Sequence, residues 1–114
     1  MRILVVDDEP MVAMSLELLV QCEGFESAGI ASTVEDALTL VSQGGFDAVI
    51  LDANLGGVFS HPVAEALQKA KIPFVVLSGY DPQQQQGRFP PNTRFLQKPC
   101  RPETLFEALR APSA

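Results

Sequence analysis

The stretch RILVVDD, residues 2–8, ends an apolar run with two adjacent acids. The same pattern recurs along the chain, where Asp52, Ser78 and Lys98 each follow a further run of mostly apolar residues. Short runs of this kind are typical of buried strands in a parallel sheet. The carboxyl ends of parallel strands meet at one sheet edge, where open α/β folds place their chemistry. We therefore expect these polar side chains to converge.

Between the apolar runs, apolar residues recur at the spacing of a helix. We expect strands over residues 2–6, 25–31, 48–51, 73–77 and 93–96, and helices over about 10–22, 32–42, 62–70 and 103–110. The apolar positions that mark three of the helices are Met11, Met14, Leu18 and Leu19, then Val34, Ala37, Leu38 and Val41, then Leu105, Phe106 and Leu109. Ser32 or Thr33 is expected to cap the second helix, and Gly56-Gly57 to form a flexible turn. Five strands that alternate with helices form an α/β, doubly wound parallel sheet.

The segment from Asp81 to Asn92 departs from this alternation. It contains four glutamines, Gly87 and Pro90-Pro91, and Phe89 is its only large apolar residue. No apolar stripe is available to a buried helix face. The fourth helix is therefore expected to be short, polar or absent.

Length and composition limit the class of protein. The 114 residues, 46% of them hydrophobic, predict a single domain over 1–114 with a real core and no output domain. The net charge of −6 argues against a duplex nucleic-acid surface. No apolar run reaches about 18 residues and no signal-peptide pattern is present, so a cytoplasmic protein is expected. Cys22 and Cys100 are then expected to be reduced thiols.

Three carboxylates at one sheet edge need a compensating charge. If Asp7, Asp8 and Asp52 converge, each pair about 4 Å apart costs roughly 4 kcal/mol at an effective dielectric constant near 20. A divalent cation relieves this repulsion, and Mg²⁺ is the hard, oxygen-binding candidate. Lys98 supplies a further positive charge. Such a set is suited to accepting and holding a phosphoryl group.

Four segments stand out in order along the chain: ILVVDDEP at 3–10, VILDANL at 49–55, FVVLSG at 74–79 and FLQKP at 95–99. Together they resemble a bacterial two-component response-regulator receiver domain. A narrower likeness to the stand-alone FAT-GUY receivers of alphaproteobacteria rests on Leu55-Gly56-Gly57, Ser60, Pro62-Val63-Ala64, Ile72-Pro73-Phe74 and Ser78-Gly79-Tyr80. The chain departs from that group where Val76-Leu77-Ser78 replaces the usual Phe-Ala-Thr.

The resemblance implies a flavodoxin-like strand order, 2-1-3-4-5, and a role for each acid of the set. Asp52 corresponds to the phosphoacceptor. Asp8 corresponds to a direct Mg²⁺ ligand and Asp7 to one that binds through water. Asn54 holds the position whose backbone carbonyl completes the metal shell.

The resemblance also implies roles for residues near the later strand ends. Ser78 would donate its hydroxyl to the phosphoryl group, and Lys98 would hold the phosphoryl oxygens, with a cis peptide bond before Pro99. Phe95 occupies the place of the aromatic switch, and Tyr80 is a further switch candidate.

The implied function is that of a signalling phosphoacceptor, with only self-catalysed phosphorylation and dephosphorylation and no enzymatic turnover. A sensor histidine kinase or histidine phosphotransfer protein would donate the phosphoryl group to Asp52. The modified protein would bind a downstream partner through the face made by residues 81–110, or serve as a phosphate sink. Neither a membrane nor a nucleic acid is an expected partner.

Other interpretations of these residues stay open. The chain is alternatively a degenerate receiver that binds a partner without phosphorylation, or a small aspartate-nucleophile phosphatase. The phosphatase class needs a second acid two residues after its nucleophile, where Asn54 stands. Taken singly, the aspartates and Ser78 are also ordinary turn or capping residues, and Phe95 is an ordinary core residue. His61, without a second histidine or a cysteine pair, is interpreted as a surface-loop residue.

Overall fold

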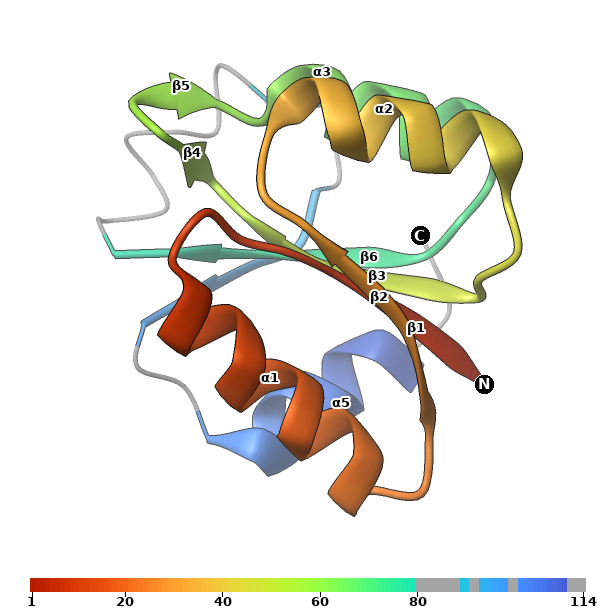
Figure 1. Ribbon diagram of the computed structural model, residues 1–114, viewed down its shortest axis with the longest axis vertical. Coiled ribbons are helices and arrows are strands. Elements are labelled where there is room, and N and C mark those ends of the chain that lie inside the picture. The colour runs from red at the N-terminus through yellow and green to blue at the C-terminus, as the bar shows by residue number, and fades with distance from the viewer. Residues whose placement is uncertain (80–88, 91–92, 99–100, 111–114) are drawn as a thin grey trace.

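The computed structural model describes residues 1–79, 89–90, 93–98 and 101–110. Five parallel strands form one sheet in the order β2-β1-β3-β6-β7 (Figure 1). They are β1 (Arg2–Val6), β2 (Glu26–Ala31), β3 (Ala48–Asp52), β6 (Phe74–Ser78) and β7 (Phe95–Gln97). The predicted doubly wound sheet and its order are thereby confirmed, since β6 and β7 are the fourth and fifth strands of this sheet.

Helices cover both faces of the sheet. In Figure 1, α2 (Val34–Gln43) and α3 (His61–Lys69) lie on one face, and α1 (Pro10–Cys22) and α5 (Pro102–Arg110) lie on the other. Alternate side chains of each central strand therefore enter two different cores. Along β1, Leu4 and Val6 join the core under α2 and α3, whereas Ile3 and Val5 join the core under α1 and α5. Burial on both faces explains why these strands are apolar without alternation.

The helix α1 was expected, but its buried face is not the stripe that marked it. Ala13, Leu16 and Val20 face the sheet, whereas Met11, Met14 and Leu18 are 82%, 60% and 61% exposed. Both sets of residues recur at helical spacing, so spacing alone does not show which set is buried. The small Ala13 side chain, 1% exposed, faces the strands and leaves the methionines outside.

The two other helices with a predicted apolar face, α2 and α5, bury that face. Ala37 and Val41 of α2 are buried, as are Leu105, Phe106 and Leu109 of α5. Thr33 caps α2, because its hydroxyl oxygen accepts the backbone N–H of Asp36 at 3.1 Å.

A two-stranded hairpin replaces the flexible turn expected after β3. Its strands are β4 (Asn54–Leu55) and β5 (Val58–Phe59), and Leu55 pairs with Val58 across a two-residue loop. The loop residues Gly56 and Gly57 have φ values of 60° and 86°, as a type I′ turn requires. Side chains are disfavoured at such φ angles, so the glycine pair sets the turn.

Several expectations concern residues outside the described ranges. The form of the fourth helix, the position of Tyr80, the peptide bond between Lys98 and Pro99, and Cys100 all fall there. Cys22 lies within the described part and is an exposed free thiol. No helix in the described ranges is long and apolar enough to cross a membrane.

Candidate functional site

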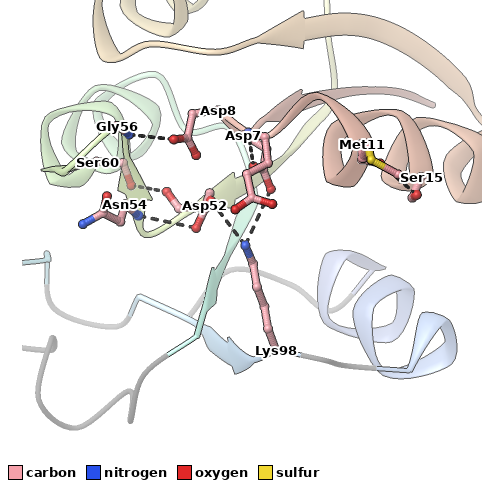
Figure 2. A network of polar contacts seen from close by, with 10 residues as sticks. Asp7, Asp8, Met11, Ser15, Asp52, Asn54, Gly56, Ser60 and Lys98 are labelled. Atoms are coloured by element: carbon pink, nitrogen blue, oxygen red, sulfur yellow. Dashed lines mark hydrogen bonds and ion pairs between the residues drawn. The ribbon is translucent and has the colours of Figure 1, made fainter.

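The predicted acids meet at the carboxyl edge of the sheet. Asp7 and Asp8 follow β1, and Asp52 is the last residue of the neighbouring strand β3. One carboxylate oxygen from each of the three residues lies within 4.8 Å of the other two (Figure 2). The sheet register therefore produces the cluster that the sequence pattern predicted.

Lys98 reaches this cluster from the end of β7. Its Nζ lies 3.2 Å from Asp52 Oδ2 and 3.6 Å from Asp7 Oδ2, so one ammonium group bridges two carboxylates (Figure 2). The backbone N–H of Lys98 donates to the carbonyl oxygen of Ser78 at 2.7 Å. This bond extends the pairing of β7 with β6 and fixes the backbone of Lys98 where its side chain reaches the acids.

The charges of the cluster are not balanced by Lys98 alone. Burial raises the pKa of the Asp52 carboxyl from 3.8 to about 6; the nearby Lys98 opposes this rise and Asp7 adds to it. Burial would lower the pKa of Lys98, but Asp52 and Asp7 outweigh it and raise that pKa above 10.5. The lysine is therefore charged at neutral pH, and the ionised Asp52 remains costly beside it. Three carboxylates face one ammonium group, so the site can accept a further cation.

Asp7 and Asp8 differ in their surroundings. Asp7 is buried, and its Oδ1 accepts the backbone N–H of Glu9 at 2.9 Å. Its Oδ2 is also buried and has no hydrogen-bond partner among the described residues, although Lys98 Nζ lies 3.6 Å away. Asp8 Oδ2 accepts the backbone N–H of Gly56 in the hairpin turn at 2.9 Å. Neither acid caps α1, which has no side-chain capping bond. The buried oxygen of Asp7 and the hard carboxylate donors fit a Mg²⁺ ligand set.

Asn54, two residues after Asp52, shapes the hairpin. Its backbone N–H donates to Asp52 Oδ1 at 3.4 Å, and its side-chain oxygen accepts the backbone N–H of Gly57 at 2.9 Å. The side chain therefore closes the turn, and the backbone of Asn54 lies next to the acid cluster. This placement is compatible with the backbone role expected for this residue.

Ser78 lies on β6, the strand next to β3, and Phe95 lies on β7, the strand beyond it. Ser78 ends β6, is fully buried and directly follows Leu77, the partner of Asp52 in the sheet register. Phe95 begins β7, is half-buried and meets the ring of Phe89 edge-on, with centroids 5.2 Å apart. Ser78 is thus at the carboxyl edge of the sheet, whereas Phe95 pairs with Val76, two residues before that edge. Their roles toward a phosphoryl group stay predictions.

The interpretation of His61 as a surface-loop residue is wrong. His61 is the first residue of α3 and is half-buried, because its ring meets Phe89 edge-on with centroids 6.3 Å apart. The rings of Phe95, Phe89 and His61 thus form a continuous row. Among the described residues, only the three aspartates gather as potential metal ligands.

Ser60 belongs to the sequence pattern shared with the FAT-GUY receivers, but that likeness implies no role for it. Its hydroxyl is fully buried and donates to the backbone carbonyl oxygen of Asp52 at 2.5 Å (Figure 2). Beyond that likeness, a serine just before a helix predicts only an ordinary helix cap. Nothing in the sequence pattern links it to a residue eight positions earlier.

Comparison with known proteins agrees with this arrangement. The family described as the response regulator receiver domain matches residues 3–110. The solution structure of SdrG from Sphingomonas melonis Fr1 superimposes with a TM-score of 0.81 at 41% identity, and the alignment covers 96% of each chain. The crystal structure of the response regulator PhyR from Brucella abortus gives a TM-score of 0.78 at 30% identity, covering 95% of this chain and 45% of that one.

Curated relatives are longer than this chain. The phyllosphere-induced regulator PhyR of Methylorubrum extorquens is 30% identical over 91% of this chain and 40% of its own length. The positive alginate biosynthesis regulatory protein of Pseudomonas aeruginosa is 34% identical over 99% of this chain and 47% of its own length. The chain thus spans less than half the length of these two relatives, and the similarity concerns one domain of each.

Proposed function

Because this chain belongs to the response regulator receiver domain family, we propose that Asp52 accepts a phosphoryl group from a phosphohistidine. The donor is a sensor histidine kinase or a histidine phosphotransfer protein. One observation carries the proposal: the Asp52 carboxylate sits at a strand end with Lys98 Nζ at 3.2 Å and two further acids beside it. This combines a nucleophile, a positive charge and a ligand set for a cation at one point.

In the proposed reaction, a carboxylate oxygen of Asp52 attacks the phosphorus of the donor in line with the leaving nitrogen. An oxygen–phosphorus bond forms, the phosphorus–nitrogen bond breaks, and its electron pair stays on the imidazole, which takes up a proton from water. With a pKa of about 6, Asp52 is largely ionised at neutral pH and needs no base. Lys98 compensates charge on the transferred group, and positioning and charge neutralisation supply most of such catalysis.

Asp7, Asp8 and Asp52, with the backbone carbonyl of Asn54, would hold Mg²⁺. Bound there, the ion supplies positive charge that relieves carboxylate repulsion and offsets the charge of the phosphoryl oxygens. Asp8 already accepts the N–H of Gly56, so its carboxylate is held at the cluster by the hairpin.

Phosphorylation then shifts an equilibrium between two conformations that bind a partner differently. The ion pair of Lys98 with Asp52 links the acid cluster to the end of β7. This link supports the choice of residues 81–110 as the partner surface, with Ser78, Phe95 and Tyr80 as switch candidates. The PhyR protein of Bartonella quintana, 25% identical to this chain, is an anti-anti-sigma factor, so a regulatory protein is the favoured class of downstream partner. The protein would act in the cytoplasm, without turning over a substrate.

The rival functions find less support. A degenerate receiver is disfavoured because the three acids and Lys98 are brought together. A phosphatase is disfavoured because the position of its second acid holds Asn54, whose side chain is committed to Gly57.

The test is phosphorylation with acetyl phosphate or a candidate histidine kinase in the presence of Mg²⁺. We expect one phosphoryl group per molecule, absent in Asp52→Asn and in excess chelator. Equal labelling of Asp52→Asn would refute Asp52 as the acceptor. Many turnovers of a small phosphate monoester would instead support the phosphatase.

A further inference from the structure

Ser60 occupies the N-cap position of α3 but does not cap this helix. Its side chain makes no hydrogen bond to the first turn. A serine at this position ordinarily accepts a backbone N–H of its own helix, which stabilises the first turn. Here the fully buried hydroxyl donates to the carbonyl oxygen of Asp52 instead, at 2.5 Å. The hydroxyl thus serves the strand end that carries the proposed phosphoacceptor.

The backbone of Ser60 holds the next peptide group as well. Its N–H donates to the carbonyl oxygen of Ala53 at 2.9 Å. One residue therefore fixes two consecutive carbonyls, and Asn54 follows directly. From the other side, the N–H of Ala53 donates to the carbonyl of Leu77 in β6 at 2.9 Å. The peptide group between Asp52 and Ala53 is consequently held at both its oxygen and its nitrogen.

This double attachment restricts the motion that would matter most at the site. Without a partner for its oxygen, the Asp52–Ala53 peptide plane gains freedom to rotate, and rotation redirects the Cα–Cβ bond of Asp52 and the carbonyl of Asn54. A displacement of about 1 Å at a reacting group costs on the order of a hundredfold in rate. Asp52 is a buried residue and Ser60 is fully buried, so loss of the hydroxyl leaves the carbonyl with little access to a replacement partner.

We propose that Ser60 is a positioning residue for phosphoryl transfer, because its hydroxyl and N–H fix the chain from Asp52 to Asn54. The inference rests on the function proposed for Asp52, and it adds a residue that touches neither the phosphoryl group nor the metal. Figure 2 shows Ser60 on the side of Asp52 away from Lys98, so the two residues hold the backbone and the carboxylate from different directions.

The test compares Ser60→Ala with Leu67→Ala, both measured well below their melting temperatures. Leu67 is fully buried in the same helix, and its truncation is expected to lower the melting temperature without removing the Ser60 bonds. Two quantities are measured: the phosphorylation rate constant at saturating acetyl phosphate and Mg²⁺, and the dissociation constant of Mg²⁺ by calorimetry without any phosphodonor. We expect Ser60→Ala to lower the rate constant and weaken Mg²⁺ binding by about tenfold or more each, as for outer-shell partners of metal sites. Leu67→Ala is expected to keep both parent values.

Parent values for Ser60→Ala would overturn the inference. So would equal losses in Leu67→Ala, because the effect would then follow stability and not the hydrogen bonds. If the parent protein itself accepts no phosphoryl group, the proposed function fails. In that case the Mg²⁺ dissociation constants alone still decide whether Ser60 positions the site.

Discussion

Among single residues, Asp52 gives the clearest case of a charge that destabilises the folded protein. Its folded pKa of about 6 lies above the ordinary value of 3.8, chiefly because the carboxyl is buried. A raised carboxyl pKa means that the folded state binds the proton more tightly than the unfolded state. Stability from this group is therefore complete below about pH 4 and is lost as the pH rises through about 6. The nucleophile is kept ionised at neutral pH at the expense of the fold.

We predict that Asp52→Asn stabilises the protein at pH 7.5 in chelator. The difference between the folded and ordinary pKa means that ionisation of Asp52 costs the folded state about 3 kcal/mol. The amide of asparagine does not ionise, so the variant avoids this cost. Urea denaturation between pH 4 and pH 7.5 measures this, and the advantage of the variant should grow with pH. Parallel pH profiles of the parent and the variant would contradict the prediction.

Lys98 is expected to matter more for the response than for folding. Its side chain is 30% exposed, so Lys98→Ala should remain folded. The alanine removes the ammonium group that links the Asp52 side chain to β7. We predict that beryllofluoride changes amide exchange across residues 93–98 in the parent, and that most of this change disappears in Lys98→Ala. Lys69→Ala, which removes an exposed lysine, should respond as the parent does. A full response in Lys98→Ala would count against the assigned role.

Among the elements, the sequence predicts the strands best, because central parallel strands are apolar on both faces and end in recognisable polar residues. It predicts α1 but not its buried face, since Ala13 and Met14 both fit rows of helical spacing. It also misses the hairpin of β4 and β5, because strands of two residues are too short to show an alternating pattern. The convergence of Asp7, Asp8, Asp52 and Lys98 was predictable from strand order. The bond from Ser60 to Asp52 was not, because it joins a loop end to a backbone atom.

The hairpin turn gives a prediction of its own. At Gly57, φ is 86°, and a Cβ added there meets no atom within 4 Å. Any cost of substitution therefore comes from the backbone. We expect Gly57→Ala to destabilise the protein by about 1 kcal/mol or more, and Gly57→Asn by clearly less, because asparagine tolerates positive φ. Urea denaturation of both variants provides the measurement, and equal losses would show that the φ angle is not the cause.

The acids of the cluster come from parts of the sequence that are far apart, and they meet only when the whole molecule folds. Their mutual repulsion therefore lowers the free energy of unfolding of the whole molecule. A ligand at about 100 times its dissociation constant adds about 2.7 kcal/mol of stability. We predict that the melting temperature rises with Mg²⁺ and that Asp8→Ala removes most of the rise. Glu65→Ala, which deletes an exposed acid of α3, serves as the matched control and should keep it. An unchanged melting temperature of the parent in millimolar Mg²⁺ would argue against a metal site.

Met11, Met14 and Leu18 form an exposed apolar row on α1, and we predict that this row controls how molecules of the protein attract one another in solution. At low ionic strength, the net charge of −6 keeps molecules apart. The screening length falls from about 10 Å at 0.1 M salt to about 3 Å at 1 M, whereas apolar attraction between the rows persists. The osmotic second virial coefficient, measured by static light scattering, should therefore drop steeply with added salt. Met14→Gln interrupts the row without changing the charge, so it should flatten this dependence.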